Sequence, residues 1–99
     1  MLIQDYVAKG LTSVRNDMGE IRTTNVDDGY ISIIFPNGWV SSIVIDPQTE
    51  KAKYSVAVCD YEGYFDWNVL RPFGTDKGTI LCNSEEEVCK ALDIIISLK

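Results

Sequence analysis

Two β-rich runs joined by a tight turn decide the fold of this chain, and they occupy residues 30–45, YISIIFPNGWVSSIVI. The turn between them is Pro36-Asn37-Gly38. Asn-Gly pairs accept the positive φ angles that tight hairpins require, and the flanking runs are rich in Ile and Val, which favour strands. The stretch therefore predicts strands over residues 30–35 and 39–45 that pair antiparallel.

Further short β-rich runs flank this hairpin, each bounded by turn residues such as Gly, Pro and Asp. We expect an edge strand before it and two strands after it, over residues 21–24, 53–60 and 64–70, and a further short strand over residues 79–82 after a loop. Residues 71–77 contain Pro72 and Gly74 and predict a surface loop. Strands that follow one another through short turns form an antiparallel meander, so we expect a meander of about five strands.

Side-chain size alternates along the predicted strand over residues 53–60. Bulky Tyr54, Val56 and Val58 share one face, whereas the residues between them are serine, alanine and cysteine. Successive side chains of a strand point to opposite faces of its sheet. The small-residue face is thus suited to close packing against a helix or a neighbouring layer.

Apolar residues at helical spacing mark both ends of the chain. Residues 2–18 carry such a stripe, and Asn16, Asp17 and Gly19 supply a stop signal. Near the other end, Ser84 and Glu87 form the pattern of a capping box ahead of a second apolar stripe. We therefore predict one α+β domain over residues 1–99, with an N-terminal helix, the β meander, and a C-terminal helix packed on one sheet face.

Composition excludes several classes of function. The 99 residues include nine Lys plus Arg against 15 Asp plus Glu, for a net charge of -6, and direct binding of nucleic acid requires a clustered cationic face instead. Histidine is absent, and no phosphate-binding or nucleophile motif occurs. We accordingly expect no enzyme and no cofactor.

The three cysteines, Cys59, Cys82 and Cys89, form no CxxC pair. Their odd number is typical of a reducing compartment, and a metal site built from the three thiolates would lack an apparent fourth ligand. We expect buried thiols, no metal, no signal peptide, no membrane-spanning segment and a cytoplasmic protein.

The densest mixture of aromatic and acidic residues lies in residues 60–67, DYEGYFDW. Large aromatic side chains on a surface supply rigid contact area, and neighbouring carboxylates can bind Arg or Lys of a partner. Arg71 follows shortly after. The candidate partner-binding residues are Asp60, Tyr61, Glu62, Tyr64, Asp66, Trp67 and Arg71.

A simpler interpretation of the same segment remains open. Half of its aromatic side chains could belong to the core, with the acids doing no more than solvating a turn. The carboxylates could also be taken as a cation site or an acid–base pair, but the segment lacks the ligand order of a calcium loop and so small a domain offers little room for a glycosidase cleft. Glu85, Glu86 and Glu87 are explained by capping and the helix dipole.

Three stretches resemble small uncharacterised proteins carried by bacteriophages and mobile elements. These proteins share an F-x-N-G-aromatic hairpin, a Y-x-V-A-V strand and a terminal S-x-E-E-V helix. The matching residues here are 34–43, 54–58 and 84–88, and the likeness covers about two thirds of the chain without the first helix. The resemblance implies a phage or prophage origin, no catalytic residues, and a role through binding, such as interference with a host defence system.

The leading hypothesis is a small acidic protein-binding module that occupies a basic surface on a host protein, for example a CRISPR effector. An immunity protein that neutralises one cognate toxin is a second hypothesis. A third is a small-molecule-binding domain in which Tyr61, Tyr64, Trp67 and Arg71 line a pocket. Dimerisation through an exposed edge strand is compatible with all three.

Overall fold

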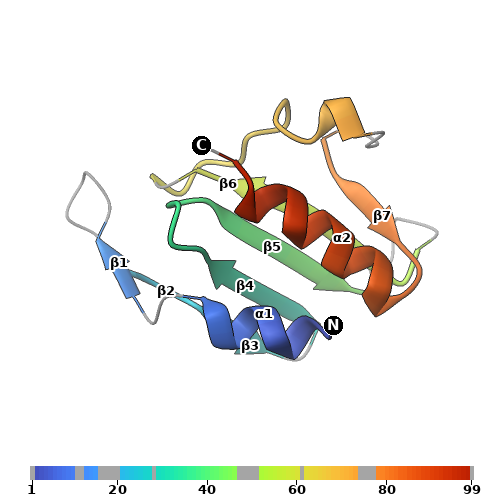
Figure 1. Ribbon diagram of the computed structural model, residues 1–99, viewed down its shortest axis with the longest axis horizontal. Coiled ribbons are helices and arrows are strands. Elements are labelled where there is room, and N and C mark those ends of the chain that lie inside the picture. Colours follow the sequence, from blue (N-terminus) through green and yellow to red (C-terminus); the bar gives the residue numbers. More distant parts are fainter. Residues whose placement is uncertain are drawn as a thin grey trace.

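The computed structural model describes residues 2–10, 13–15, 21–27, 29–46, 52–60, 62–73 and 78–98. Within them an antiparallel sheet has the order β3 (Asn25–Asp27), β4 (Tyr30–Ile34), β5 (Val40–Ile45), β6 (Tyr54–Cys59) and β7 (Ile80–Cys82). Helices α1 (Ile3–Lys9) and α2 (Glu85–Ile96) lie at the two ends of the chain (Figure 1). The predicted α+β fold with a five-stranded meander is thus confirmed.

The hairpin of β4 and β5 forms as its sequence predicts. Ile34 pairs with Val40 in antiparallel register, and the Phe35 N–H donates to the Trp39 carbonyl at 2.9 Å to close the turn. Gly38 has a φ of +91°, a conformation that a side chain makes costly. The Asn-Gly turn therefore supplies the conformational freedom that joins two strands of strong β propensity.

Both helices cover the same face of the sheet (Figure 1). One apolar cluster joins α1, α2 and the inward side chains of the central strands, among them Tyr6, Ile33, Ile43, Val56 and Leu92. The buried Tyr6 hydroxyl donates to Asp93 Oδ1 at 2.7 Å and so connects α1 to α2. Helices and sheet thus form two layers around one core.

The face of β6 that packs against the helices is the bulky one. Tyr54, Val56 and Val58 belong to the main core or contact it, whereas Ala57 and Cys59 point to the opposite face. Of the two alternatives expected for the small-residue face, a helix is wrong, although Ala57 and Cys59 on that face are buried. Large side chains fill the space between a sheet and a helix layer better than small ones do, because interiors pack at high density.

Helix α2 begins where the capping pattern predicts. Ser84 Oγ accepts from the Glu87 N–H at 3.3 Å, and three glutamates occupy the first turn. The Glu87 carboxylate accepts from the Asn83 N–H at 2.5 Å, one residue before the N-cap that a capping box would use. The carboxylate still satisfies an amide at the positive end of the helix dipole.

Helix α1 is shorter than its apolar stripe predicts. It ends at Lys9, because Gly10 leaves the helical region with ψ at 155°. Residues expected to continue it instead form strand β1 (Ser13–Arg15), which pairs with β2 (Ile21–Thr23) in a separate two-stranded sheet. Residues 21–23 are therefore a strand, but not an edge of the main sheet.

The side chain of Asn37 fixes the hairpin turn to the C-terminus of α2. Its Nδ2 donates to the carbonyls of Ile95, Ile96 and Leu98 at 2.9, 3.0 and 3.1 Å. Its Oδ1 accepts from the Trp39 N–H at 3.1 Å. One residue thereby binds carbonyls in the last turn of α2 and just beyond it, and also shapes the hairpin turn.

Candidate functional site

The predicted strand over residues 64–70 does not form. Phe65 makes an isolated antiparallel bridge with Cys59, and the Asp66 N–H donates to the Val58 carbonyl at 3.0 Å. After this bridge the chain turns inward, and Leu70 is fully buried in the core. Burial of Leu70 draws the segment away from β6, so its alternating pattern produces one bridge instead of a strand.

A tight turn holds the candidate segment against β6. The Asp60 N–H donates to the Tyr64 carbonyl at 2.9 Å, and Asp60 Oδ1 accepts from the N–H groups of Glu62 and Tyr64, both at 3.0 Å. Gly63 has a φ of +100°. Asp60 is therefore a structural residue of the turn, as the simpler interpretation of the segment expects.

Three aromatic side chains of this segment are exposed. Tyr64 is 61% exposed, and Phe65 and Trp67 are each 46% exposed. The rings of Phe65 and Trp67 stack with centroids 5.0 Å apart and planes at 5° to each other. These three residues belong to the surface, which excludes the interpretation that they form part of the core.

Two acidic residues, Glu62 and Asp66, lie close to the stacked pair in the sequence. Glu62 and Asp66 are half-buried, and Asp66 Oδ1 accepts from the Asn68 N–H at 3.0 Å. No lysine or arginine occurs between residues 60 and 70. The segment, here called the aromatic hairpin and comprising residues 60–67, thus combines exposed ring surface with negative charge.

One predicted site residue, Arg71, does not join this arrangement. Arg71 lies in the 3₁₀ helix η1 (Arg71–Phe73), beyond the buried Leu70, and it is exposed. Tyr61 lies outside the described residues. Phe65 belongs to the aromatic hairpin although we did not include it among the candidate residues; its shared alternation with Trp67 was the signal in the sequence.

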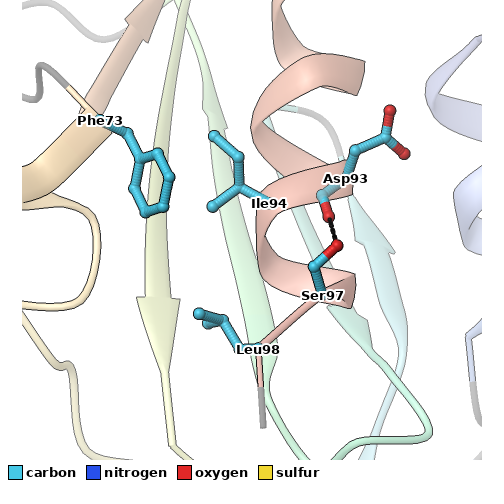
Figure 2. Close-up of a pocket in the computed structure, with 5 residues that line it drawn as sticks. All are labelled: Phe73, Asp93, Ile94, Ser97 and Leu98. Carbon is cyan, nitrogen blue, oxygen red and sulfur yellow. Dashed lines mark hydrogen bonds between the residues drawn. The ribbon is translucent and has the colours of Figure 1, made fainter.

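Two cavities lined by described residues adjoin α2, and their linings do not include Tyr64, Trp67 or Arg71, which a small-molecule pocket was expected to use. One, of about 380 Å³, lies among Phe73, Asp93, Ile94, Ser97 and Leu98. Figure 2 shows the Phe73 ring beside Ile94, with Leu98 below it, while the Asp93 carboxylate points away. The second, of about 330 Å³, shares Phe73 and Ile94 and extends to β7.

Phe73 is a functional candidate that the sequence did not reveal. It is 49% exposed, and it lines both cavities. The sequence around Phe73, between Pro72 and Gly74, does not indicate which segment its ring contacts. Helix α2 is distant from Phe73 in the sequence and comes close to it only in the folded chain.

The three cysteines are free and buried, as predicted. Burial, with a smaller contribution from the Glu87 carboxylate, raises the pKa of the Cys82 thiol to about 11. Burial also raises the pKa of the Cys89 thiol. Across the described residues, no group of three or more Cys, Asp or Glu side chains is arranged to hold a metal ion.

These shifts predict that the protein loses stability at alkaline pH. The unfolded chain releases thiol protons near the ordinary pKa of 9, whereas the folded chain retains the Cys82 proton up to about pH 11. The contribution of Cys82 to the free energy of unfolding should therefore be constant below about pH 8, and the free energy of unfolding should fall as the pH rises from 9 to 11. Urea denaturation over this range measures the effect.

A Cys82→Ala variant provides the control for this measurement. Its unfolding free energy should be lower at pH 7, because a buried group is lost, but its decline between pH 9 and 11 should be shallower than that of the parent chain. An equal decline in both proteins would show that Cys82 does not carry the effect.

No helix among the described residues is long and apolar enough to cross a membrane. Comparison with protein-family models, curated proteins and solved structures gives no match for this chain.

Proposed function

We propose that this protein is a non-enzymatic protein-binding module that uses the aromatic hairpin to bind a basic surface of another protein. The observation that carries the proposal is the stack of Phe65 and Trp67, both close to half exposed, next to the more exposed Tyr64. Contiguous exposed apolar patches mark sites of interaction with other molecules, and Trp and Tyr dominate the binding energy of protein interfaces.

Charge supports the choice of a basic partner. The chain carries a net charge of -6, and Glu62 and Asp66 belong to the same hairpin as the stacked rings. An Arg guanidinium can stack on an aromatic face while it pairs with a carboxylate. We expect association to slow as ionic strength rises, because charge attraction mainly accelerates encounter.

The proposal also includes the kind of partner and the cell compartment. Resemblance to small phage-encoded proteins favours an inhibitor of a host defence protein such as a CRISPR effector, and an immunity protein that neutralises a toxin is the alternative. Three free, buried cysteines are typical of a reducing compartment, so we place the protein in the cytoplasm.

Replacing Tyr64 and Trp67 together by alanine tests the proposal. Both side chains are exposed, so the melting temperature should fall by only a few degrees, corresponding to about 1 kcal/mol for the lost ring stack. Affinity for the partner should fall at least 100-fold, since each hot-spot residue contributes about 2 kcal/mol or more. The partner is first identified by affinity capture and mass spectrometry, and its affinity is then measured by calorimetry.

The matched control replaces Leu2 and Val26, which are 54% and 60% exposed on other elements, by alanine. This variant should bind like the parent chain. If the Tyr64 and Trp67 variant retains full affinity, the aromatic hairpin is not the binding surface. If it unfolds, the two rings stabilise the fold and their exposure has no bearing on function.

A further inference from the structure

Strand β7 forms one edge of the main sheet. It pairs with β6 from Tyr54 to Val56, and in the part of the chain that the structure describes no strand lies on its other side. Along β7, every second residue of an antiparallel strand directs its N–H and C=O groups away from its neighbour. The outer side of β7 is therefore a template on which another extended chain could form a ladder.

The aromatic hairpin continues this edge. β7 pairs with the first half of β6, whereas Phe65 pairs with Cys59 at the end of β6. A β-carbon built on Gly78, two residues before β7, would lie 2.5 Å from the Trp67 carbonyl oxygen. The start of β7 and the end of the aromatic hairpin therefore touch, and both border β6 on the same side.

A mainly apolar cavity lies beside β7 on the helix side of the sheet. Its volume is about 330 Å³, and its lining combines Phe73, Ile80, Cys82, Ala91 and Ile94 with the charged residues Glu87 and Lys90. Register places Ile80 and Cys82 on the face that carries Tyr54 and Val56, which is the face covered by the helices. A strand added beside β7 would direct alternate side chains into this cavity.

The intervening side chains of such a strand would point to the opposite face. Leu81 lies on that face because it pairs with Ser55, and Phe65 shares it because it pairs with Cys59. Trp67 stacks on Phe65, and Asp60 and Glu62 lie in the turn that precedes Phe65. Exposed ring faces attract Arg and Lys side chains, so this side of the edge fits basic side chains, whereas the apolar part of the cavity on the helix side fits apolar ones.

We propose that β7 binds an extended segment of the partner as an additional strand, in which apolar residues alternate with Arg or Lys. This inference rests on the proposed function, because it assigns the basic side chains to the aromatic hairpin. It adds the backbone pairing and the apolar contacts with Phe73 and Ile94. Strand addition of this kind takes affinity from main-chain hydrogen bonds and specificity from pockets for alternate side chains.

The first test is selection of ten-residue peptides from a random displayed library on the full chain. We expect enriched peptides to alternate apolar and basic residues. In a selected peptide, either the odd-numbered or the even-numbered amides face β7, because only every second amide of a strand points to one neighbour. N-methylation of the set that faces β7 should weaken binding at least tenfold, and N-methylation of the other set should have little effect. Selected peptides without this alternation would overturn the proposal, and so would equal losses of affinity on methylation of either set of amides.

Single substitutions separate this inference from the proposed function. Phe73→Ala should weaken the selected peptide at least tenfold, and Trp67→Ala should weaken it as well. Val26→Ala, on the opposite edge strand β3, should leave its affinity within twofold. If Trp67→Ala weakens binding and Phe73→Ala does not, the aromatic hairpin binds the partner but strand addition is wrong. If Trp67→Ala has no effect, the proposed function itself fails.

A second copy of this chain could also pair with β7, and the same variants test that possibility. Sedimentation at the concentration used for selection should show a monomer. A dimer that is dissociated by Phe73→Ala would mean that a second copy of the chain occupies the edge, and the proposed occupant would then be wrong.

Discussion

Replacing Gly78 by alanine should lower the free energy of unfolding by about 3 kcal/mol or more, a larger loss than we predict for any other glycine-to-alanine substitution in this protein. Gly78 has a φ of +87°, which strains any residue with a β-carbon. The added carbon would also lie 2.5 Å from the Trp67 carbonyl oxygen and 2.7 Å from its Cα. Both of these are backbone atoms, so relief requires the aromatic hairpin to move.

Gly29→Ala is the matched control for this experiment. Gly29 has a similar φ of +81°, but among the described residues its β-carbon would meet only the Ile45 carbonyl oxygen, at 4.0 Å. Its cost should therefore be the backbone strain alone, about 1 to 2 kcal/mol. Thermal unfolding of both variants measures the difference. Equal losses would show that Gly78 is required for its φ angle and that its contact with Trp67 relaxes freely.

The Gly78 variant also bears on function. Because the clash is with the backbone of Trp67, a variant that still folds at low temperature should bind the partner more weakly than its remaining stability explains. Gly29→Ala should bind normally when folded, since Gly29 lies in the turn between β3 and β4.

Asn37→Asp should destabilise the protein by about 3 kcal/mol at neutral pH. The Asn37 amide donates to three carbonyls at the end of α2, and a carboxylate can only accept. The introduced negative charge would face those carbonyls and the negative end of the helix dipole. Asn37→Ala removes the bonds without adding charge and should cost less, about 2 kcal/mol.

The pH dependence identifies the cause of the Asn37→Asp effect. In the folded Asn37→Asp protein, the nearby carbonyls should raise the pKa of the introduced carboxyl. The variant should therefore regain stability relative to the parent as the pH falls below about 5 and this carboxyl is protonated. Asn68→Asp makes the same change at an exposed position and should cost less than 1 kcal/mol. A loss for Asn37→Asp that does not depend on pH would contradict the proposed charge repulsion.

Asn37 also illustrates the limit of local sequence patterns. The Asn-Gly pair predicts a hairpin, and the hairpin forms, because turn conformation depends on the turn residues themselves. Nothing in residues 36–38 indicates that Asn37 caps a helix almost sixty residues later. The contact exists because the hairpin turn and the end of α2 meet in the folded chain.

The aromatic hairpin shows both sides of sequence-based inference. Composition alone singled out residues 60–67, and Tyr64 and Trp67 are indeed exposed. Alternation predicted that Phe65 and Trp67 share a face, but it also predicted a full strand, which is wrong. The burial of Leu70 is a long-range packing effect that alternation over a few residues does not contain.

The sequence by itself determined the elements whose causes are local. Apolar periodicity and Ser84 specify α2, the turn residues and β-branched runs specify the β4–β5 hairpin, and lack of histidine narrows the possible chemistry. Only the tertiary structure decided which sheet face the helices cover, where α1 ends, and which side chains border the β7 edge. Those outcomes depend on how segments distant in the chain pack together, and no local pattern encodes the packing of both partners at once.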